Sequence, residues 1–229
     1  PEYGLGGLPE GFSRLAAVNG GTFMLGRDIS EIVRGKDGNV IGVISKNPDE
    51  KDQEEAATAS IVVGDPTYFE SSRCEMVEHV VHSICILKNP IPRLGQDVDS
   101  CQIIIPQGQC NRQHDIYITM VGRKLRCVPE GKFVVTISTT VEGDISSAIN
   151  ELAPAIAVVG GSDNILERFD EVAPYFVPKE ELEVDNCYCS KSYDATSHFE
   201  TILNDVFGLY KRITGEDLDL DATPKKEQK

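Results

Sequence analysis

A glycine-rich stretch opens the chain and has the composition of a nucleotide-binding loop. It reads YGLGGLPEGFSRLAAVNGGTFM over residues 3–24. A dinucleotide-binding loop needs a preceding strand, three glycines in the pattern G-x-G-x-x-G and a following helix. Gly4 and Gly6 fit, but Pro9 takes the place of the third glycine and only three residues precede Gly4. We therefore predict that this segment binds no dinucleotide and has another role.

Other residues with catalytic potential occur without the spacing that catalysis requires. The segment RGKDG at 34–38 pairs glycine with lysine, but Asp37 stands where a phosphate-binding P-loop needs Ser or Thr. The sequence contains neither the G-x-S-x-G pattern of serine hydrolases nor the H-E-x-x-H pattern of zinc proteases. We therefore expect no catalytic residues and no enzymatic activity.

Cysteines and histidines do not form a recognisable metal site. The seven cysteines are scattered along the chain, which is typical of a reduced cytosolic protein. Cys187 and Cys189 lie closer together than the usual spacing of zinc ligands, so two residues on one face of a strand is the simpler interpretation. His79 and His82 would point to opposite faces of a strand, and His198 is interpreted as a solvated residue at a helix start.

The segment SYDATSHFE, residues 192–200, joins a strand to a helix N-terminus, where an anion or the ribityl chain of a flavin could lie. Many flavoproteins have a Gly-Asp pair at this strand end. Here Tyr193 precedes Asp194, and its ring would crowd an approach that only glycine permits cheaply. We expect the position in the fold to be kept without the flavin.

Hydrophobic periodicity predicts the elements that position these residues. Residues 8–19 are predicted as a helix ended by Gly20-Gly21, and 29–45 as a hairpin. Residues 22–25 and 57–65 are predicted as strands. A largely antiparallel sheet is predicted from segments separated by Pro and Gly, which are 76–87, 101–106, 115–121 and 132–141.

The C-terminal part combines helical and extended segments. Residues 145–161 are predicted to be helical in their first half, with a break at Pro154, and residues 164–178 to be extended. The last helix is predicted to begin at a capping box of Ser197 and Glu200 and to end at Gly215, with Lys211 and Arg212 in its last turn.

Composition indicates an ordinary soluble globular protein. Of the 229 residues, 40% are hydrophobic and 26% charged. The net charge of −15 opposes binding to nucleic acid or anionic lipid headgroups, because phosphates would be repelled. No apolar stretch approaches the roughly 20 residues that span a bilayer. The chain starts without Met, in the middle of a motif, so we expect it to be part of a longer protein.

Several long blocks together resemble one family, the Rab GDP-dissociation inhibitors, in their C-terminal half. The resemblance covers nearly all of 1–215 and is weakest over 47–56 and 120–130. It is carried by the opening stretch and by GDPTYF, SICILKNPIP, SCQIIIPQGQCNRQHDIYI, FVVTISTTVE and SYDATSHFETILNDVFGLYKRITG. Rab escort proteins share the architecture, but the short tail after YKRITG looks more like the inhibitors.

The resemblance implies an α/β fold with α+β character, related to flavin-dependent enzymes but without a cofactor. On this analogy 1–72 belong to a Rossmann-like domain, 73–179 form an inserted, mainly antiparallel sheet, and 180–229 return to the Rossmann-like domain with a C-terminal helix and polar tail. A helical domain that holds prenyl groups would lie outside these residues.

The resemblance also implies a function. Such inhibitors bind prenylated Rab GTPases in the GDP state, slow GDP release, and recycle the GTPases between membranes and cytosol in vesicle transport. We therefore expect a monomeric, cytoplasmic regulator of small GTPases that associates with membranes transiently, through the Rab. The alternatives are a Rab escort protein and a fragment of a flavin-dependent amine-oxidase-like enzyme, because the region 11–33 also resembles such oxidases.

The opening stretch would then form part of a Rab-binding platform. The family positions carried onto this chain are Gly7, Glu10, Arg14, Thr22 and Met24. The last three match the family pattern, whereas the family usually has Glu in place of Gly7 and Gln in place of Glu10. Helical spacing would let Glu10 pair with Arg14. In the structural alternative, Arg14 balances helix charge and Met24 fills the core.

Overall fold

The computed structural model describes residues 2–47, 53–69, 73–95, 97–196 and 199–221. The described chain forms two compact units. Unit 1 takes its residues from Pro1–Gly26, Met76–Tyr175 and Tyr193–His198, and unit 2 from Arg27–Glu75, Phe176–Ser192 and Phe199–Lys229. In the part of the chain that is described, no helix is long and apolar enough to cross a membrane.

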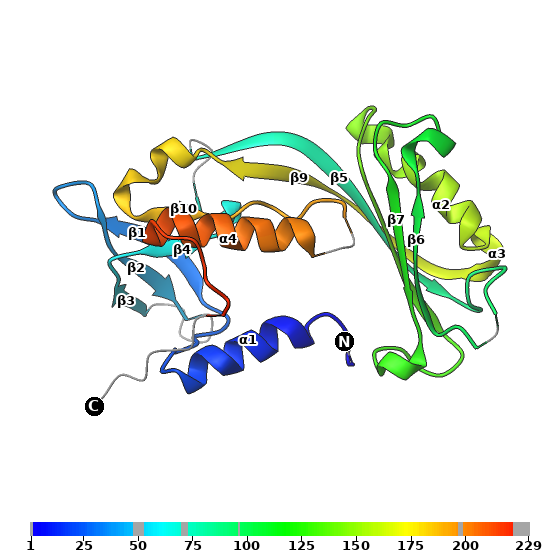
Figure 1. The fold of residues 1–229 in the computed structure, drawn as a ribbon, viewed down its shortest axis with the longest axis horizontal. Helices are drawn as coiled ribbons and strands as arrows, with labels where there is room; N and C mark the ends of the chain where they lie inside the picture. Colours follow the sequence, from blue (N-terminus) through cyan, green and yellow to red (C-terminus); the bar gives the residue numbers. More distant parts are fainter. Residues whose placement is uncertain (1, 48–52, 70–72, 96, 197–198, 222–229) are drawn as a thin grey trace. The chain divides into compact units, whose positions relative to one another are not determined.

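A five-stranded sheet with the order β6-β7-β8-β5-β9 is the main element of unit 1 (Figure 1). Its pairs β6–β7, β7–β8 and β5–β8 are antiparallel, which confirms the predicted sheet. The extended segment predicted before the last helix is the edge strand β9. The bounds are β5 (Cys74–Leu87), β6 (Ser100–Ile105), β7 (Ile116–Val121), β8 (Phe133–Thr140) and β9 (Ile165–Pro178), with 3₁₀ turns η2 (Gln107–Gln109) and η3 (Arg123–Leu125).

Helices cover one face of this sheet. They are the 3₁₀ helix η4 (Ile145–Leu152), α2 (Ala153–Val158) and α3 (Gly161–Asn164). Alternate residues of β7 are buried, as a strand with one covered face requires. The core between the layers contains Val81, Cys85, Leu87, Ile116, Ile118, Met120, Val135, Ile137, Ala148, Leu152, Ala155 and Val159. The helical first half and the break predicted near Pro154 are both present, because η4 ends at Leu152 and α2 begins at Ala153, but the segment after the break is helical as well. Pro154 lies in the first turn of α2, where its missing N–H group costs no hydrogen bond.

Unit 2 contains two small sheets. The predicted hairpin is formed by β1 (Asp28–Arg34) and β2 (Val40–Lys46), and β3 (Glu54–Thr58) pairs with β2. Strands β4 (Val62–Gly64) and β10 (Cys187–Cys189) form a parallel pair. The single strand predicted over 57–65 is therefore wrong, because its two halves pair with different partners: Ala59 N–H donates to Ile41, whereas Val62 N–H donates to Asn186. The 3₁₀ turns are η1 (Pro66–Tyr68) and η5 (Glu180–Asp185).

The two long helices end as the sequence predicts. Helix α1 (Gly7–Val18) closes in a Schellman motif, in which Gly21 N–H donates to Ala16 O and Gly20 N–H to Ala17 O. Helix α4 (Glu200–Thr214) ends at Gly215, whose φ is 79°. Its N-cap is Phe199, which caps without a side-chain hydrogen bond. The predicted capping residue Ser197 and the neighbouring His198 lie outside the described residues.

Candidate protein-binding site

Three of the five platform positions lie on α1. Gly7 is its first residue, Glu10 lies in the first turn, and Arg14 follows one turn later. All three are exposed. No ion pair joins the described side chains of Glu10 and Arg14, so their predicted pairing is not formed. Both charges are therefore available to a partner molecule.

Thr22 and Met24 lie in the segment that follows α1. They are exposed, and 52% of the surface of Met24 is accessible. The predicted strand over 22–25 does not form, and β1 begins only at Asp28. The Schellman motif and the positive φ of 65° at Gly26 turn the backbone at both ends of this segment. All five positions thus come from one continuous stretch of unit 1.

The apolar side chains of α1 are exposed. Phe12 and Leu15 have 71% and 61% of their surfaces accessible. Val18 is 78% accessible, and the helix has no buried residue. The apolar face of α1 is therefore not covered within the described chain, and Met24 does not fill the core.

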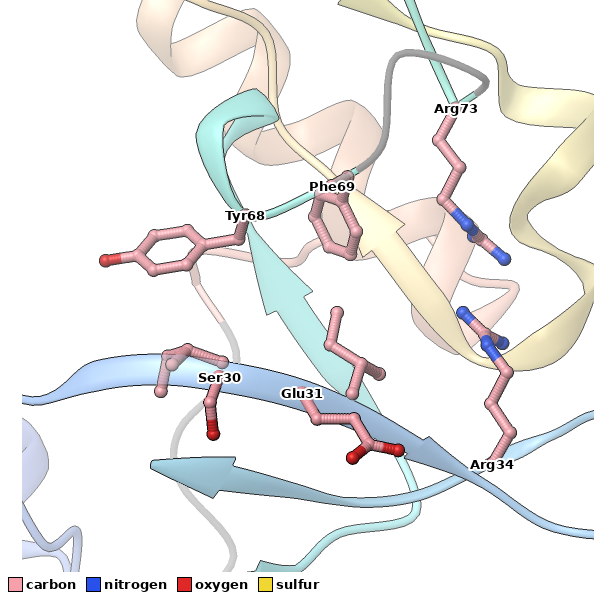
Figure 2. A pocket seen from close by; sticks show the side chains of 8 residues that line it. Ser30, Glu31, Arg34, Tyr68, Phe69 and Arg73 are labelled. Atoms are coloured by element: carbon pink, nitrogen blue, oxygen red, sulfur yellow. The ribbon is translucent and has the colours of Figure 1, made fainter. Parts of the chain in front are cut away.

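A cavity of about 540 Å³ in unit 2 is the other candidate site. Figure 2 shows the guanidinium groups of Arg34 and Arg73 pointing toward one another at its wall, while the ring of Tyr68 points away. Both guanidinium groups bind the carboxylate of Asp185. Arg73 binds it in bidentate fashion, and Arg34 also donates to Gly38 O at 3.2 Å. The cluster links β1, the residue that precedes β5, and η5, which favours a structural role over ligand binding.

The charge balance of this cluster determines how Asp185 titrates. Burial, the largest single influence, opposes its ionisation. The hydrogen bonds from Arg73 and from the Cys187 N–H group, together with the charges of Arg73 and Arg34, outweigh burial and lower the pKa of Asp185. The carboxylate is therefore ionised at neutral pH and holds both arginines.

Among the described cysteines and histidines, Cys187, Cys189, His79 and His82 lie on strands, as predicted. Cys189 lies on β10, and its Sγ atom is 3.4 Å from Sγ of Cys74. Burial raises the pKa of the Cys189 thiol well above its usual range. His79 and His82 lie on β5, and burial lowers the pKa of His82 against the opposing charge of Glu171.

Residues 194–196, within the segment where the ribityl chain of a flavin could lie, form a local turn. Asp194 accepts hydrogen bonds from the backbone N–H of Thr196 at 2.9 Å and from its hydroxyl at 2.6 Å. Ser138 on β8 donates to Ala195 O at 2.6 Å, which attaches the segment to the sheet of unit 1. Tyr193 is 78% accessible.

Comparison with known proteins decides the family. The family model described as GDP dissociation inhibitor matches residues 1–225. This chain belongs to the GDP dissociation inhibitor family. It is 44% identical over 227 residues to the "Probable secretory pathway GDP dissociation inhibitor 1" of Schizosaccharomyces pombe, with 99% of the chain and 48% of the relative covered. It is 39% identical over 227 residues to "Rab GDP dissociation inhibitor beta" of Rattus norvegicus, with the same coverage.

Solved structures agree with this assignment to the GDP dissociation inhibitors. The crystal structure of the Rab GDI of Plasmodium falciparum matches with a TM-score of 0.84 and 38% identity, covering 96% of this chain and 47% of that one. A flavin-dependent halogenase from Brevundimonas matches with a TM-score of 0.52 at 12% identity, covering 92% of this chain and 41% of that one, so it shares the fold alone. The flavoprotein-like fold inferred from the sequence is confirmed. The chain spans about half the length of the curated relatives it matches.

Sequence reasoning on this GDP dissociation inhibitor chain missed the contacts that join distant segments. Arg34 and Asp185 are 151 residues apart, and no local pattern links them. The same holds for the contacts of Glu2 and Tyr3 with Arg126, which lies 123 residues beyond Tyr3. The sequence shows which residues carry opposite charges, but it does not show which of these residues contact each other.

Proposed function

We propose that this chain contributes to a Rab GDP-dissociation inhibitor, which binds prenylated Rab GTPases in the GDP state, slows GDP release and recycles the GTPases between membranes and cytosol. The observation that carries the proposal is the match to the family over residues 1–225. It is supported by relatives named as Rab GDP dissociation inhibitors and by the exposure of all five platform positions.

The physical requirement for such a protein is clear. Each buried CH₂ group of a lipid chain contributes about 0.8 kcal/mol to membrane binding, and two chains anchor a protein stably. A prenylated Rab stays in the cytosol only while another protein covers its lipids. This task needs no catalytic residue and no cofactor, so the proposal is of a monomeric cytoplasmic regulator that meets membranes transiently through the Rab.

The platform for the switch regions of the Rab would be formed by Gly7, Glu10, Arg14, Thr22 and Met24. Arg14 offers a planar set of donors to acidic or carbonyl groups, Met24 an adaptable apolar contact, and Thr22 a hydroxyl. Gly7 and Glu10 depart from the usual family pattern, so one acidic contact is lost and another gained nearby. We propose that this exchange changes the preference among Rabs.

The test is nucleotide-dependent binding by the full-length protein. We expect it to bind prenylated Rab loaded with GDP much more tightly than the same Rab loaded with a GTP analogue. We also expect it to slow the release of fluorescent GDP and to extract the Rab from vesicles. Equal affinity for the two nucleotide states would contradict the proposal. A stoichiometric flavin absorption band would favour the oxidoreductase alternative, and presentation of unprenylated Rab to a prenyltransferase would favour the escort protein.

A further inference from the structure

The attachment of α1 to unit 1 depends on a few polar contacts. Helix α1 has no buried residue, and its N-cap Gly6 makes no side-chain capping bond. Helices in proteins owe most of their stability and placement to the packing of an apolar face. Within the described chain α1 lacks this support, so other contacts must fix the position of its N-terminal end.

Those contacts converge on the turn between β7 and β8. Tyr3 N–H donates to Leu125 O at 2.6 Å, and Arg126 Nη1 donates to the Tyr3 hydroxyl at 2.7 Å. Arg126 Nε lies 2.8 Å from Glu2 Oε1, and the guanidinium lies 5.6 Å from the centre of the Tyr3 ring. Two hydrogen bonds and one ion pair thus join Glu2 and Tyr3 to Leu125 and Arg126.

The backbone on both sides of the contact is sharply turned. Arg126 has a φ of 55° and donates its N–H to Arg123 O at 2.8 Å. Tyr3 and Gly4 have φ values of 68° and 92°, and Gly4 O accepts from the N–H of Gly7 at 3.3 Å. A side-chain-bearing residue adopts this conformation only when its surroundings hold it. A single turn of backbone thus separates Tyr3, which contacts Arg126, from Gly7, the first residue of α1.

We propose that Arg126 is a positioning residue for the Rab-binding platform. It holds Glu2 and Tyr3, and through them the end of α1 that carries Gly7 and Glu10. This inference rests on the proposed function. The turn that carries Arg126 connects β7 and β8, two strands of the sheet that forms the core of unit 1. Arg126 therefore fixes the position of the exposed helix α1 relative to this sheet.

Arginine suits this role because one planar guanidinium can pair with a carboxylate, donate to a hydroxyl and lie over an aromatic ring. The side chains of Arg126 and Glu2 are 61% and 55% exposed, so their ion pair alone contributes little. The cluster of Glu2, Tyr3 and Arg126 instead fixes the orientation of α1. We expect its loss to weaken Rab binding by about tenfold, a clear but incomplete loss of affinity.

The experiment measures the affinity of full-length variants for one prenylated, GDP-loaded Rab. We expect Arg126→Ala and Tyr3→Ala each to weaken binding about tenfold, and Arg126→Lys to lie between Arg126→Ala and the unchanged protein. The matched control is Arg123→Ala. Arg123 lies in the same turn but pairs with Glu130, and it should leave affinity unchanged. The double variant of Arg126→Ala with Tyr3→Ala should bind no more weakly than either single variant. Additive losses would show that Arg126 contacts the Rab itself and would overturn the positioning role.

Amide hydrogen exchange of α1 in the free protein gives a readout that does not involve the Rab. Arg126→Ala should speed exchange over residues 7–18 while the melting temperature changes little. Unchanged exchange overturns the inference even if the unmodified protein binds Rab. If the unmodified protein binds no prenylated Rab, the proposed function fails and the platform role with it, whereas faster exchange would still establish the contact itself.

Discussion

The sheet of unit 1 and the helix α1 differ in what covers them. Val81, Leu87 and Ile118 are fully buried between the strands and the layer of η4 and α2, whereas α1 has no buried residue. One face of the sheet is covered by η4 and α2, which follow β8 in the sequence. The helix keeps its apolar and charged side chains accessible. Substitutions in the sheet should therefore act on stability, and substitutions on α1 should act on binding.

The largest effect should come from a cavity in the sheet. Ile118 on β7 is fully buried, and we expect Ile118→Ala to lower the free energy of unfolding by about 4 kcal/mol, through lost burial and the cavity that remains. The matched variant is Ile104→Ala on β6, where 45% of the side chain is accessible and the loss should be well under half as large. Urea titration measures both. Similar losses at the two sites would contradict the layered core.

Unit 2 offers a polar counterpart to that core. Asp185→Asn removes the charge that holds Arg34 and Arg73, and we expect a loss of about 3 kcal/mol in the free energy of unfolding, because two partly buried arginines lose the carboxylate charge that they share. The pKa of Asp185 is lowered in the folded state, so its stabilisation is present above the ordinary value near 4 and is lost as pH falls through the folded pKa. Denaturation titrations between neutral pH and pH 3 should therefore show a shallower acid dependence for Asp185→Asn. An unchanged acid dependence would show that this carboxylate is not coupled to the arginines.

On α1 the expected effect shifts from stability to binding. We expect Arg14→Ala to weaken binding of GDP-loaded Rab by about 2 kcal/mol, with little change in melting temperature, because Arg14 is exposed in the free chain. Lys46→Ala removes another exposed positive charge, one on β2 that pairs with Glu54, and serves as the control. Both quantities are measured on one preparation. A lower melting temperature with unchanged affinity would place Arg14 in the fold and not in the binding site.

The smallest effects are expected from two glycines of this region, one with a positive φ and one inside the helix. Gly20 has a φ of 92°, so Gly20→Ala should destabilise by about 1 kcal/mol. Gly11 lies inside α1 with open space around it, and Gly11→Ala should stabilise by up to about 1 kcal/mol. Thermal unfolding of the two variants should show shifts of opposite sign. Shifts of the same sign would contradict the role of Gly20 in the Schellman motif that follows α1.

Much of the fold was predictable because it depends on local spacing. The strands of the antiparallel sheet, the hairpin at 28–46 and the glycines that end α1 and α4 follow from periodicity and turn chemistry. Local reasoning failed where the pairing partner lies far away. The segment 57–65 reads as one strand but joins two different sheets, and 22–25 reads as a strand but does not form one.

The sequence by itself determined the family, the candidate platform positions and the lack of a dinucleotide fingerprint, because motifs and their spacing are properties of the linear chain. Only the tertiary structure decided which side chains meet. Asp185 joins Arg34 to Arg73, and Arg126 joins the start of α1 to the turn after β7, across more than 100 residues in each case. Such contacts depend on how strands and turns are brought together by burial of the core, which no local pattern of charges specifies.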